Sequence, residues 1–225
     1  MKTAARLARV CEILRALYQD EMLNNKENPT DEYFFLILSS KTSYKLYEQL
    51  YEELYNYVQR DWNNIITLGE GEIERIIRRG GLSRLKAHWI KEASNKMKSD
   101  FGKVTLEPLR TWDDHMAEKY LLGLPGAGVK IAKAIMMYSL GRKVLPVDTH
   151  TYKIAVNIGL IEDKWDLRNE RGVVHQILES IVPPDCRRVF HVGSVVIGRT
   201  FCRPGNPLCE SCPLKNMCLK RESRS

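Results

Sequence analysis

Lys130 and Asp148, eighteen residues apart, are the two side chains whose types and settings point most directly to chemistry. Lys130 falls in the first turn of a predicted helix, where the helix dipole disfavours an ammonium and lowers the lysine pKa. A partly neutral amine is a nucleophile. Asp148 precedes another apolar-periodic run, so we expect it to cap that helix and stay ionised. The pair predicts a nucleophile with an acidic partner, although each residue alone also fits a solvated lysine or a simple cap.

The segment before Lys130, Leu-Pro-Gly-Ala-Gly-Val, joins predicted helices over residues 112–122 and 129–140. Gly126 and Gly128 let the backbone turn tightly there. Unpaired N–H groups at the start of the following helix then form an anion site, so we expect them to hold a phosphate with help from Lys133. The sequence therefore predicts a helix-hairpin-helix.

Six cysteines are present, and four of them crowd together in the spacing Cys-x6-Cys-x2-Cys-x5-Cys: Cys202, Cys209, Cys212 and Cys218. A reducing compartment disfavours disulfides, so we interpret these four thiols as metal ligands. Zinc and an iron–sulfur cubane both accept four thiolates, and the spacing alone does not separate them. Cys11 and Cys186 are predicted to be packed, inert thiols.

The chain has 225 residues, 44% of them hydrophobic and 28% charged, which fits one large or two small lobes with a real core. A formal net charge of +7 favours an anionic partner, although simple solubility explains it as well. The sequence has no apolar run of bilayer-spanning length, and the first residues lack the apolar core of a signal peptide. We therefore expect no membrane partner and a cytoplasmic protein, or a nuclear one in a eukaryote.

Apolar residues recur at helical spacing along the chain, and strand-like alternation of useful length is absent from the sequence. The fold class predicted is all-α. The expected helices, besides the two of the hairpin, cover residues 3–24, 31–38, 44–60, 63–68, 70–79, 85–98, 168–182 and 185–199.

Leu-Pro-Gly-Ala-Gly-Val-Lys, ending at Lys130, and Val-Asp-Thr-His around Asp148 closely resemble the helix-hairpin-helix DNA glycosylases of the endonuclease III type. The cysteine spacing is similar to the [4Fe-4S] loop of endonuclease III and adenine-mismatch glycosylases. The resemblance implies that Lys130 attacks the sugar C1′, that Asp148 assists, and that the four cysteines hold a [4Fe-4S] cluster. It also implies two helical lobes, a barrel lobe over residues 24–135 with the hairpin and a cluster lobe over 1–23 plus 136–225.

A base inside a duplex must be flipped out before its sugar can be attacked. The resemblance implies that Leu82 plugs the gap and that Lys41 is a second probe, where the family usually has glutamine. Because lysine only donates hydrogen bonds, we expect Lys41 to favour acceptor-rich opposite bases such as guanine, unless it only contacts phosphate. Equal excision rates opposite all four bases would contradict that preference. His150 is a further candidate in the DNA site, either orienting Asp148 or serving structure.

These observations together predict a bifunctional DNA glycosylase and abasic-site lyase of base excision repair, acting as a monomer on double-stranded DNA that contains a damaged or modified pyrimidine. Two alternatives remain open: a monofunctional mismatch or modified-base glycosylase, and a cluster-bearing DNA-binding protein without catalysis. A hypermodified base in foreign DNA is a further possible substrate. Phosphate contacts are also expected from four basic residues near the cysteines: Arg199, Arg203, Lys215 and Lys220.

Overall fold

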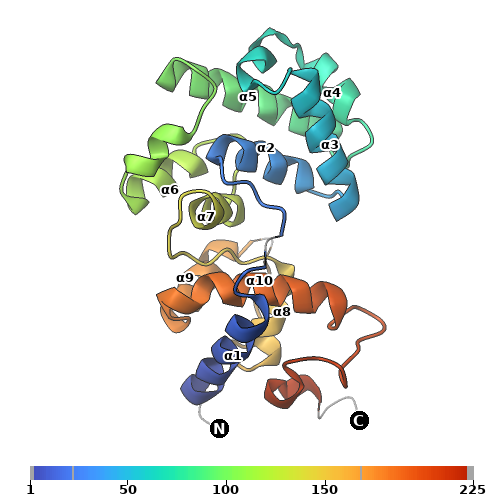
Figure 1. The fold of residues 1–225 in the computed structure, drawn as a ribbon, viewed down its shortest axis with the longest axis vertical. Helices are drawn as coiled ribbons and strands as arrows, with labels where there is room; N and C mark the ends of the chain where they lie inside the picture. The colour runs from blue at the N-terminus through green and yellow to red at the C-terminus, as the bar shows by residue number, and fades with distance from the viewer. Residues whose placement is uncertain (1–2, 22, 168, 222–225) are drawn as a thin grey trace. The chain divides into compact units, whose positions relative to one another are not determined.

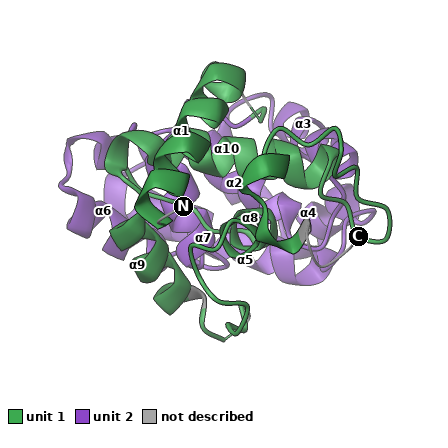
Figure 2. Ribbon diagram, turned by 90° about the horizontal axis from the view of Figure 1, so that it is seen from below, with its two compact units in different colours: residues 1–24, 143–225 green, residues 25–142 purple. Residues whose placement is uncertain are grey.

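The structure, a computed structural model, describes residues 3–21, 23–167 and 169–221. Every regular element in these ranges is an α-helix or a 3-10 helix (Figure 1), which confirms the all-α prediction. None of the helices in the described part is both long and apolar enough to span a membrane. Contacts divide the chain into two compact units, which Figure 2 colours separately: unit 1, residues 1–24 and 143–225, and unit 2, residues 25–142.

Unit 2 is organised around α2, which packs against α3, α5 and α7. In Figure 1, α7 lies on one side of α2, and α3, α4 and α5 lie on the other. The elements of this unit are α2 (Pro29–Ser39), α3 (Tyr44–Tyr57), η1 (Trp62–Thr67), α4 (Glu70–Ile77), α5 (Ser83–Phe101), η2 (Glu107–Thr111), α6 (Asp114–Leu122) and α7 (Val129–Tyr138).

The start of α2 is set by its sequence. Asn28 is the N-cap, and its side-chain oxygen accepts hydrogen bonds from the N–H groups of Thr30 (2.8 Å) and Asp31 (3.2 Å). Pro29 follows at the first position, where its missing N–H costs nothing. Every residue from 33 to 38 is buried, so α2 is the apolar centre that the other helices cover.

Unit 1 is organised around α10, which packs against α1 and α8. Gly193 on α10 permits the close approach of α1, because a Cβ there would lie 2.7 Å from a methyl group of Leu14. The elements of this unit are α1 (Thr3–Tyr18), α8 (Thr149–Asn157), α9 (Arg171–Ile181), α10 (Pro184–Thr200), η3 (Lys215–Met217) and η4 (Leu219–Arg221).

Cys11 on α1 and Cys186 on α10 form a disulfide. Both residues are buried, as predicted, but the prediction that they are inert free thiols is wrong. Packing of the two helices brings their Cα atoms to 5.9 Å, a separation that a disulfide spans. The cysteines are 175 residues apart, so their spacing gave no sign of this contact.

The unit boundaries differ in detail from the predicted lobes. The predicted boundary after residue 135 would fall inside α7, whereas the contacts keep that helix whole and divide the chain after residue 142. The first helix is also shorter than predicted, since it ends at Tyr18 rather than near residue 24.

Replacing Cys186 by serine should lower the free energy of unfolding by about 2–4 kcal/mol, because the cross-link restricts the unfolded chain over a long loop. The urea midpoint of the purified protein measures the effect. Cys11→Ser and the double variant serve as controls and should lose the same amount, since each removes the same bond. A double variant as stable as the parent would contradict the contribution assigned to the disulfide.

Candidate functional site

The turn of the helix-hairpin-helix lies tightly against α2 and α5. Gly126 has a left-handed φ of 76°, and a Cβ at this position would lie 2.7 Å from the Trp89 ring and 2.9 Å from a methyl group of Ile37. The hydroxyl of Tyr33 donates a 2.6 Å hydrogen bond to the carbonyl of Pro125. These contacts fix the direction in which α7 begins.

Gly128 is the N-cap of α7, and its carbonyl accepts the first hydrogen bonds of the helix, from Ile131 (2.9 Å) and Ala132 (3.0 Å). The amides of Gly128 and Val129 precede those bonds, which is the arrangement expected of an anion site. A Cβ at Gly128 would meet no described atom within 4 Å, so the surface over this amide is open. The N–H of Ala127, between the two predicted glycine amides, donates to the carbonyl of Leu124 at 3.1 Å.

Lys130 lies half-buried in the first turn of α7, where the sequence predicts it. Glu32 of α2 is its electrostatic neighbour, and it is fully buried. Burial raises the Glu32 pKa to about 7, against the opposing effects of the Lys26 N–H, the Asn25 amide and the Lys130 charge. The candidate nucleophile therefore has, as its electrostatic neighbour, a carboxyl group whose pKa is raised toward neutral pH. Sequence analysis missed Glu32, which looked like an ordinary acidic residue in a first helical turn.

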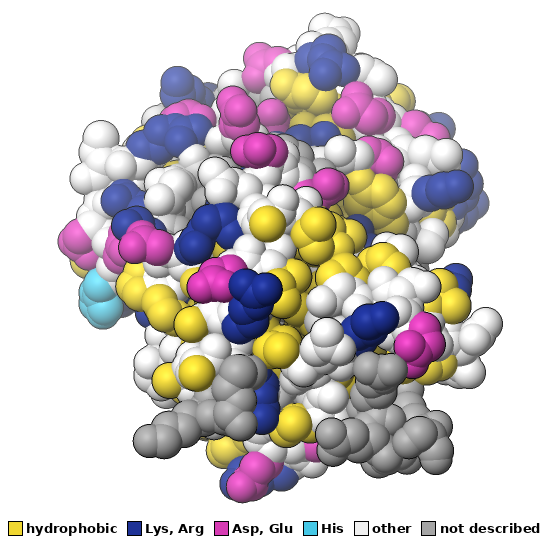
Figure 3. All heavy atoms as spheres, turned by 60° about the horizontal axis from the view of Figure 1, so that its bottom comes forward, with side chains coloured by type: hydrophobic (Ala, Val, Ile, Leu, Met, Phe, Trp, Pro, Cys, Tyr) yellow, Lys and Arg dark blue, Asp and Glu magenta, His cyan; other side chains and the backbone are white. Residues whose placement is uncertain are grey.

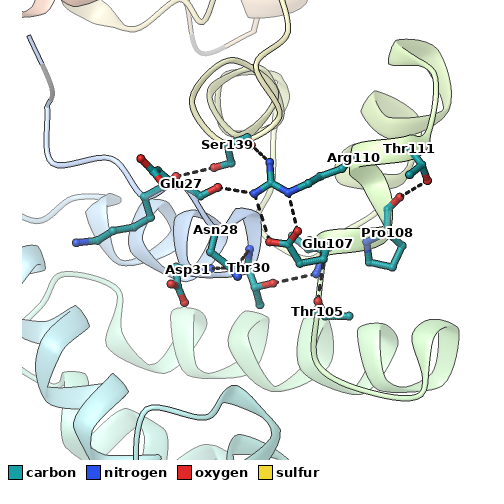
Figure 4. Close-up of polar contacts among 12 residues, drawn as sticks. Glu27, Asn28, Thr30, Asp31, Thr105, Glu107, Pro108, Arg110, Thr111 and Ser139 are labelled. Carbon is teal, nitrogen blue, oxygen red and sulfur yellow. Dashed lines mark hydrogen bonds and ion pairs between the residues drawn. The ribbon is translucent and has the colours of Figure 1, made fainter. Parts of the chain in front are cut away.

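The segment just before α2 is held against the end of α7. The Arg110 guanidinium donates to the carbonyls of Ser139 (2.5 Å) and Glu27 (2.9 Å) and pairs with Glu107 at 2.6 Å (Figure 4). The Ser139 hydroxyl donates to the Lys26 carbonyl at 2.7 Å. The Lys26 N–H is thereby held toward Glu32, to which it donates at 2.7 Å.

Asp148 belongs to unit 1, whereas Lys130 belongs to unit 2. Asp148 is the N-cap of α8, as predicted, and its Oδ1 accepts hydrogen bonds from the N–H (2.8 Å) and hydroxyl (2.9 Å) of Thr151. The Thr151 hydroxyl also contacts Nδ1 of the buried His191 at 3.0 Å. Because the Thr151 hydroxyl donates its hydrogen to Asp148, its oxygen accepts a hydrogen bond from the His191 imidazole. This buried chain orients the carboxylate, and the sequence alone did not reveal it.

His150 lies against α10 rather than in the chain of bonds that fixes Asp148. A Cβ added at Gly198 would clash with its ring, at 2.3 Å from Nδ1. Burial lowers the His150 pKa, with Arg199 and Lys153 acting in the same direction and Asp148 opposing them. The ring is therefore uncharged at neutral pH, which suits hydrogen bonding better than attraction of a phosphate.

The two predicted probes, Lys41 and Leu82, lie next to each other in unit 2. Lys41 follows the end of α2 with a φ of 52°, and Leu82 precedes α5 with a φ of 60°, both in the left-handed region. A Cβ at Gly81 would lie 2.3 Å from the Lys41 carbonyl oxygen, so the two backbones touch. Leu82 is 49% exposed, beside an open hollow of about 600 Å³ lined also by Arg84. The structure brings these residues together at one edge of the unit.

Lys133 is buried on α7, and its ammonium pairs with Glu118 of α6 at 3.1 Å. That carboxylate competes with a phosphate for the same charge. The structure thus assigns Lys133 a role in joining the two helices of the hairpin, and its expected phosphate contact stays a prediction.

The four cysteines near the C-terminal end line one cavity of about 40 Å³ in unit 1, together with residues of α8. All four thiols are free and partly exposed. Asn157 donates to Sγ of Cys202 at 3.4 Å, and Lys153 donates to the Cys202 carbonyl at 2.7 Å. Burial raises the Cys212 pKa, and electrostatic interaction with the other three cysteines raises it further. The loop therefore gathers four sulfur atoms around a common space.

The basic residues expected to contact phosphate have varied surroundings. Lys220 pairs with Asp163 at 2.8 Å, and Lys215 donates to the Glu210 carbonyl at 3.0 Å. Arg199 and Arg203 are exposed. On the face drawn in Figure 3, the described Lys and Arg side chains are interspersed with Asp and Glu rather than gathered in one block. Local geometry at the hairpin is thus a better guide to an anion site than the overall charge.

A hairpin of this form combines an exposed amide turn, which suits an anion, with a lysine in the first turn of its second helix. The chain belongs to the HhH-GPD superfamily of base excision DNA repair proteins, whose model matches residues 35–184.

Similar sequences include bacterial and plant proteins. Endonuclease III of Thermotoga maritima is 29% identical over 210 residues, which cover 92% of this chain and 91% of that protein. DEMETER-like protein 3 of Arabidopsis thaliana is 29% identical over 174 residues, or 70% of this chain. The match spans only 16% of the plant protein's length.

Solved structures share the fold. A trapped endonuclease III–DNA covalent intermediate has a TM-score of 0.83 over 100% of this chain and 99% of the other, at 23% identity. A thermostable thymine-DNA glycosylase has a TM-score of 0.80, covering 97% of this chain and 98% of the other at 20% identity. At these identities the similarity establishes the architecture alone.

The raised Glu32 pKa predicts a pH-dependent stability. Its carboxyl group titrates at about 7 in the folded protein against 4.5 ordinarily, so its contribution is complete below pH 4.5 and is lost as the pH rises through 7. Glu32→Gln removes this dependence. The Tm of the parent should therefore fall relative to that of the variant between pH 5 and pH 8.

The exposed Glu27, in the segment before α2, provides the matched control. Glu27→Gln should keep the pH profile of the parent. A constant Tm difference between the parent and Glu32→Gln over this pH range would show that the buried carboxyl does not titrate there.

Proposed function

We propose that this glycosylase is bifunctional, excising damaged or modified pyrimidines from duplex DNA and then cutting the strand as an abasic-site lyase. The observation that carries the proposal is the position of Lys130, in the first turn of α7 directly after the open turn of the hairpin. A backbone phosphate held by the Gly128 and Val129 amides would bring a sugar close to this amine.

In the proposed reaction the neutral Lys130 amine attacks C1′ while the glycosidic bond breaks and the base leaves with the bonding electrons. The transition state is oxocarbenium-like, so it carries positive charge. The Asp148 carboxylate, held by Thr151, would stabilise that charge. Loss of a proton and opening of the sugar ring give a Schiff base between Lys130 and C1′. Removal of a C2′ proton then expels the 3′ phosphate and cuts the strand.

The partner we propose is double-stranded DNA, bound by a monomer in the cytoplasm or, in a eukaryote, in the nucleus. Support comes from the family and from the DNA-bound endonuclease III structures that share the fold. Leu82 and Lys41 would fill the gap left by the flipped nucleotide, because both lie on one exposed edge of unit 2.

We also propose that the four-cysteine loop holds a [4Fe-4S] cluster, ligated by Cys202, Cys209, Cys212 and Cys218. In such a cluster each thiolate binds a different iron, so the sulfur atoms surround a volume. Four thiolates also suit zinc, which binds its ligands at about 2.3 Å from one ion. The cysteines here line a common cavity, which fits either group. The similarity of their spacing to the endonuclease III loop favours the cluster.

Lys130→Gln should abolish covalent trapping by borohydride on a duplex with an abasic site, because it removes the amine that forms the Schiff base. Asp148→Asn should slow release of a damaged pyrimidine from a duplex by on the order of a hundredfold, since it removes the carboxylate that would stabilise the oxocarbenium-like transition state. The exposed Lys98 of α5 gives a control of equal charge loss, and Lys98→Gln should be trapped like the parent.

Trapping that survives in Lys130→Gln would refute the assignment of the nucleophile. Base release without trapping by the parent protein would instead identify a monofunctional glycosylase. A protein that binds these duplexes but never releases a base would favour a non-catalytic role.

Elemental analysis of the purified protein tests the cluster. The expected content is about four iron and four acid-labile sulfide per chain, with visible absorbance that Cys212→Ser diminishes. Cys186→Ser lies outside the loop and should keep the full content. One zinc per chain without sulfide would contradict the cluster assignment.

A further inference from the structure

Lys86 is a fully buried lysine in unit 2, with 0% of its surface exposed. Burial lowers its pKa to about 8. Its ammonium donates to the carbonyl of Leu38 (2.7 Å) and to the hydroxyl of Thr42 (2.8 Å). Enclosing an amine is costly unless its hydrogen bonds compensate, so this side chain must stabilise a particular arrangement of its partners.

The two partners lie on either side of Lys41. Leu38 is in the last turn of α2, where carbonyls have no partner within the helix and the helix dipole is negative. Thr42 follows Lys41 directly, and its hydroxyl also donates to the Ser40 carbonyl at 3.1 Å. The Lys86 ammonium therefore connects two residues on either side of Lys41, whose backbone is left-handed.

The loop that carries Leu82 belongs to the same assembly. The Lys86 N–H donates to the Leu82 carbonyl at 2.9 Å, at the start of α5. A Cβ at Gly80 would lie 3.3 Å from the Thr42 hydroxyl, and one at Gly81 would clash with the Lys41 carbonyl. Lys86 thus contacts both loops, the loop of Lys41 through its ammonium and the loop of Leu82 through its backbone N–H.

Left-handed backbone is unfavourable at a residue other than glycine and persists only where the surroundings impose it. Lys41 and Leu82 both carry this cost, and both are exposed at their side chains. A pair of exposed side chains on strained, interlocked backbone suits insertion into a stiff, stacked ligand, because little conformational entropy remains to be lost on binding.

We propose that Lys86 is a positioning residue for DNA opening, locking Lys41 and Leu82 into one rigid two-pronged wedge through its bonds to Leu38 and Thr42. The inference rests on the proposed function, because it assumes that the ligand is duplex DNA with a displaced nucleotide. It gives α5 a role in opening the duplex, which is separate from the chemical steps proposed for Lys130 and Asp148.

The first test measures the wedge in the free protein. Lys86→Met keeps the length and apolar stem of the side chain but removes its donors. Amide hydrogen exchange in peptides covering residues 39–43 and 79–83 should accelerate on the order of tenfold, the equivalent of one to two hydrogen bonds, while α6 and α7 stay unchanged. Lys98→Met, at an exposed position of the same helix, is the matched control and should exchange like the parent.

The second test measures DNA opening. The probe is a duplex with 2-aminopurine opposite a tetrahydrofuran abasic-site analogue, whose fluorescence rises when the probe base is unstacked. Lys86→Met should lose as much of the rise as Leu82→Ala, and the double variant should lose no more than either single variant. Trapping on a single-stranded abasic oligonucleotide should match the parent, because no duplex has to be opened.

Unchanged exchange in the two peptides, a full fluorescence rise, or additive losses in the double variant would overturn the proposal. If Lys86→Met does not fold, Thr42→Val and Gly81→Ala replace it, since one removes a partner of the ammonium and the other forces the loops apart. Parent-like fluorescence in both would equally overturn it. A parent protein that opens the duplex but is never trapped contradicts the lyase instead, and the comparison of variants still decides the role of Lys86.

Discussion

The absence of a side chain at residue 126 is the constraint on which unit 2 depends. Only glycine lets the hairpin turn lie against Trp89 and Ile37, and this contact, with the Tyr33–Pro125 hydrogen bond, gives α7 its direction. Lys130 lies in the first helical turn of α7, so the direction of this helix determines its electrostatic interaction with the buried Glu32. A packing requirement of atomic size therefore determines where Lys130 lies and which buried carboxyl group is its electrostatic neighbour.

Features that depend on local sequence could be predicted. The hairpin helices, the cap at Asp148 and the four-cysteine loop follow from helical spacing, a capping residue type and a short interval along the chain. The features that escaped prediction arise from contacts between distant segments. Glu32 is buried because Asn25 and Lys26 fold back over it, and Thr151 gains its role only when α10 brings His191 to it. The Cys11–Cys186 disulfide is the extreme case, because the sequence around each cysteine does not indicate which residue it pairs with.

Two of the buried ionisable groups in unit 2 lie where the candidate site requires geometry rather than stability. Glu32 and Lys86 are both fully enclosed, and each pays the cost of desolvation. One is an electrostatic neighbour of the candidate nucleophile, and the other fastens the two exposed probes. Apolar residues of similar volume would pack more favourably at either position but would supply no hydrogen bonds. The presence of Glu32 and Lys86 therefore indicates that the hydrogen-bonded arrangement of their neighbours is needed, even at a cost in folding stability.

The division of the chain has a consequence for biosynthesis. Unit 2 is one continuous segment, residues 25–142, whereas unit 1 is assembled from both ends of the sequence. The helix α1 is synthesised before unit 2, yet its packing partner α10 ends at Thr200. At a typical elongation rate of about 5–20 residues per second, α1 waits roughly 10–35 seconds for that partner. During that interval the apolar face of α1, including Leu14, is accessible to chaperones. All residues of unit 2 are synthesised before α10, so unit 2 completes its fold first.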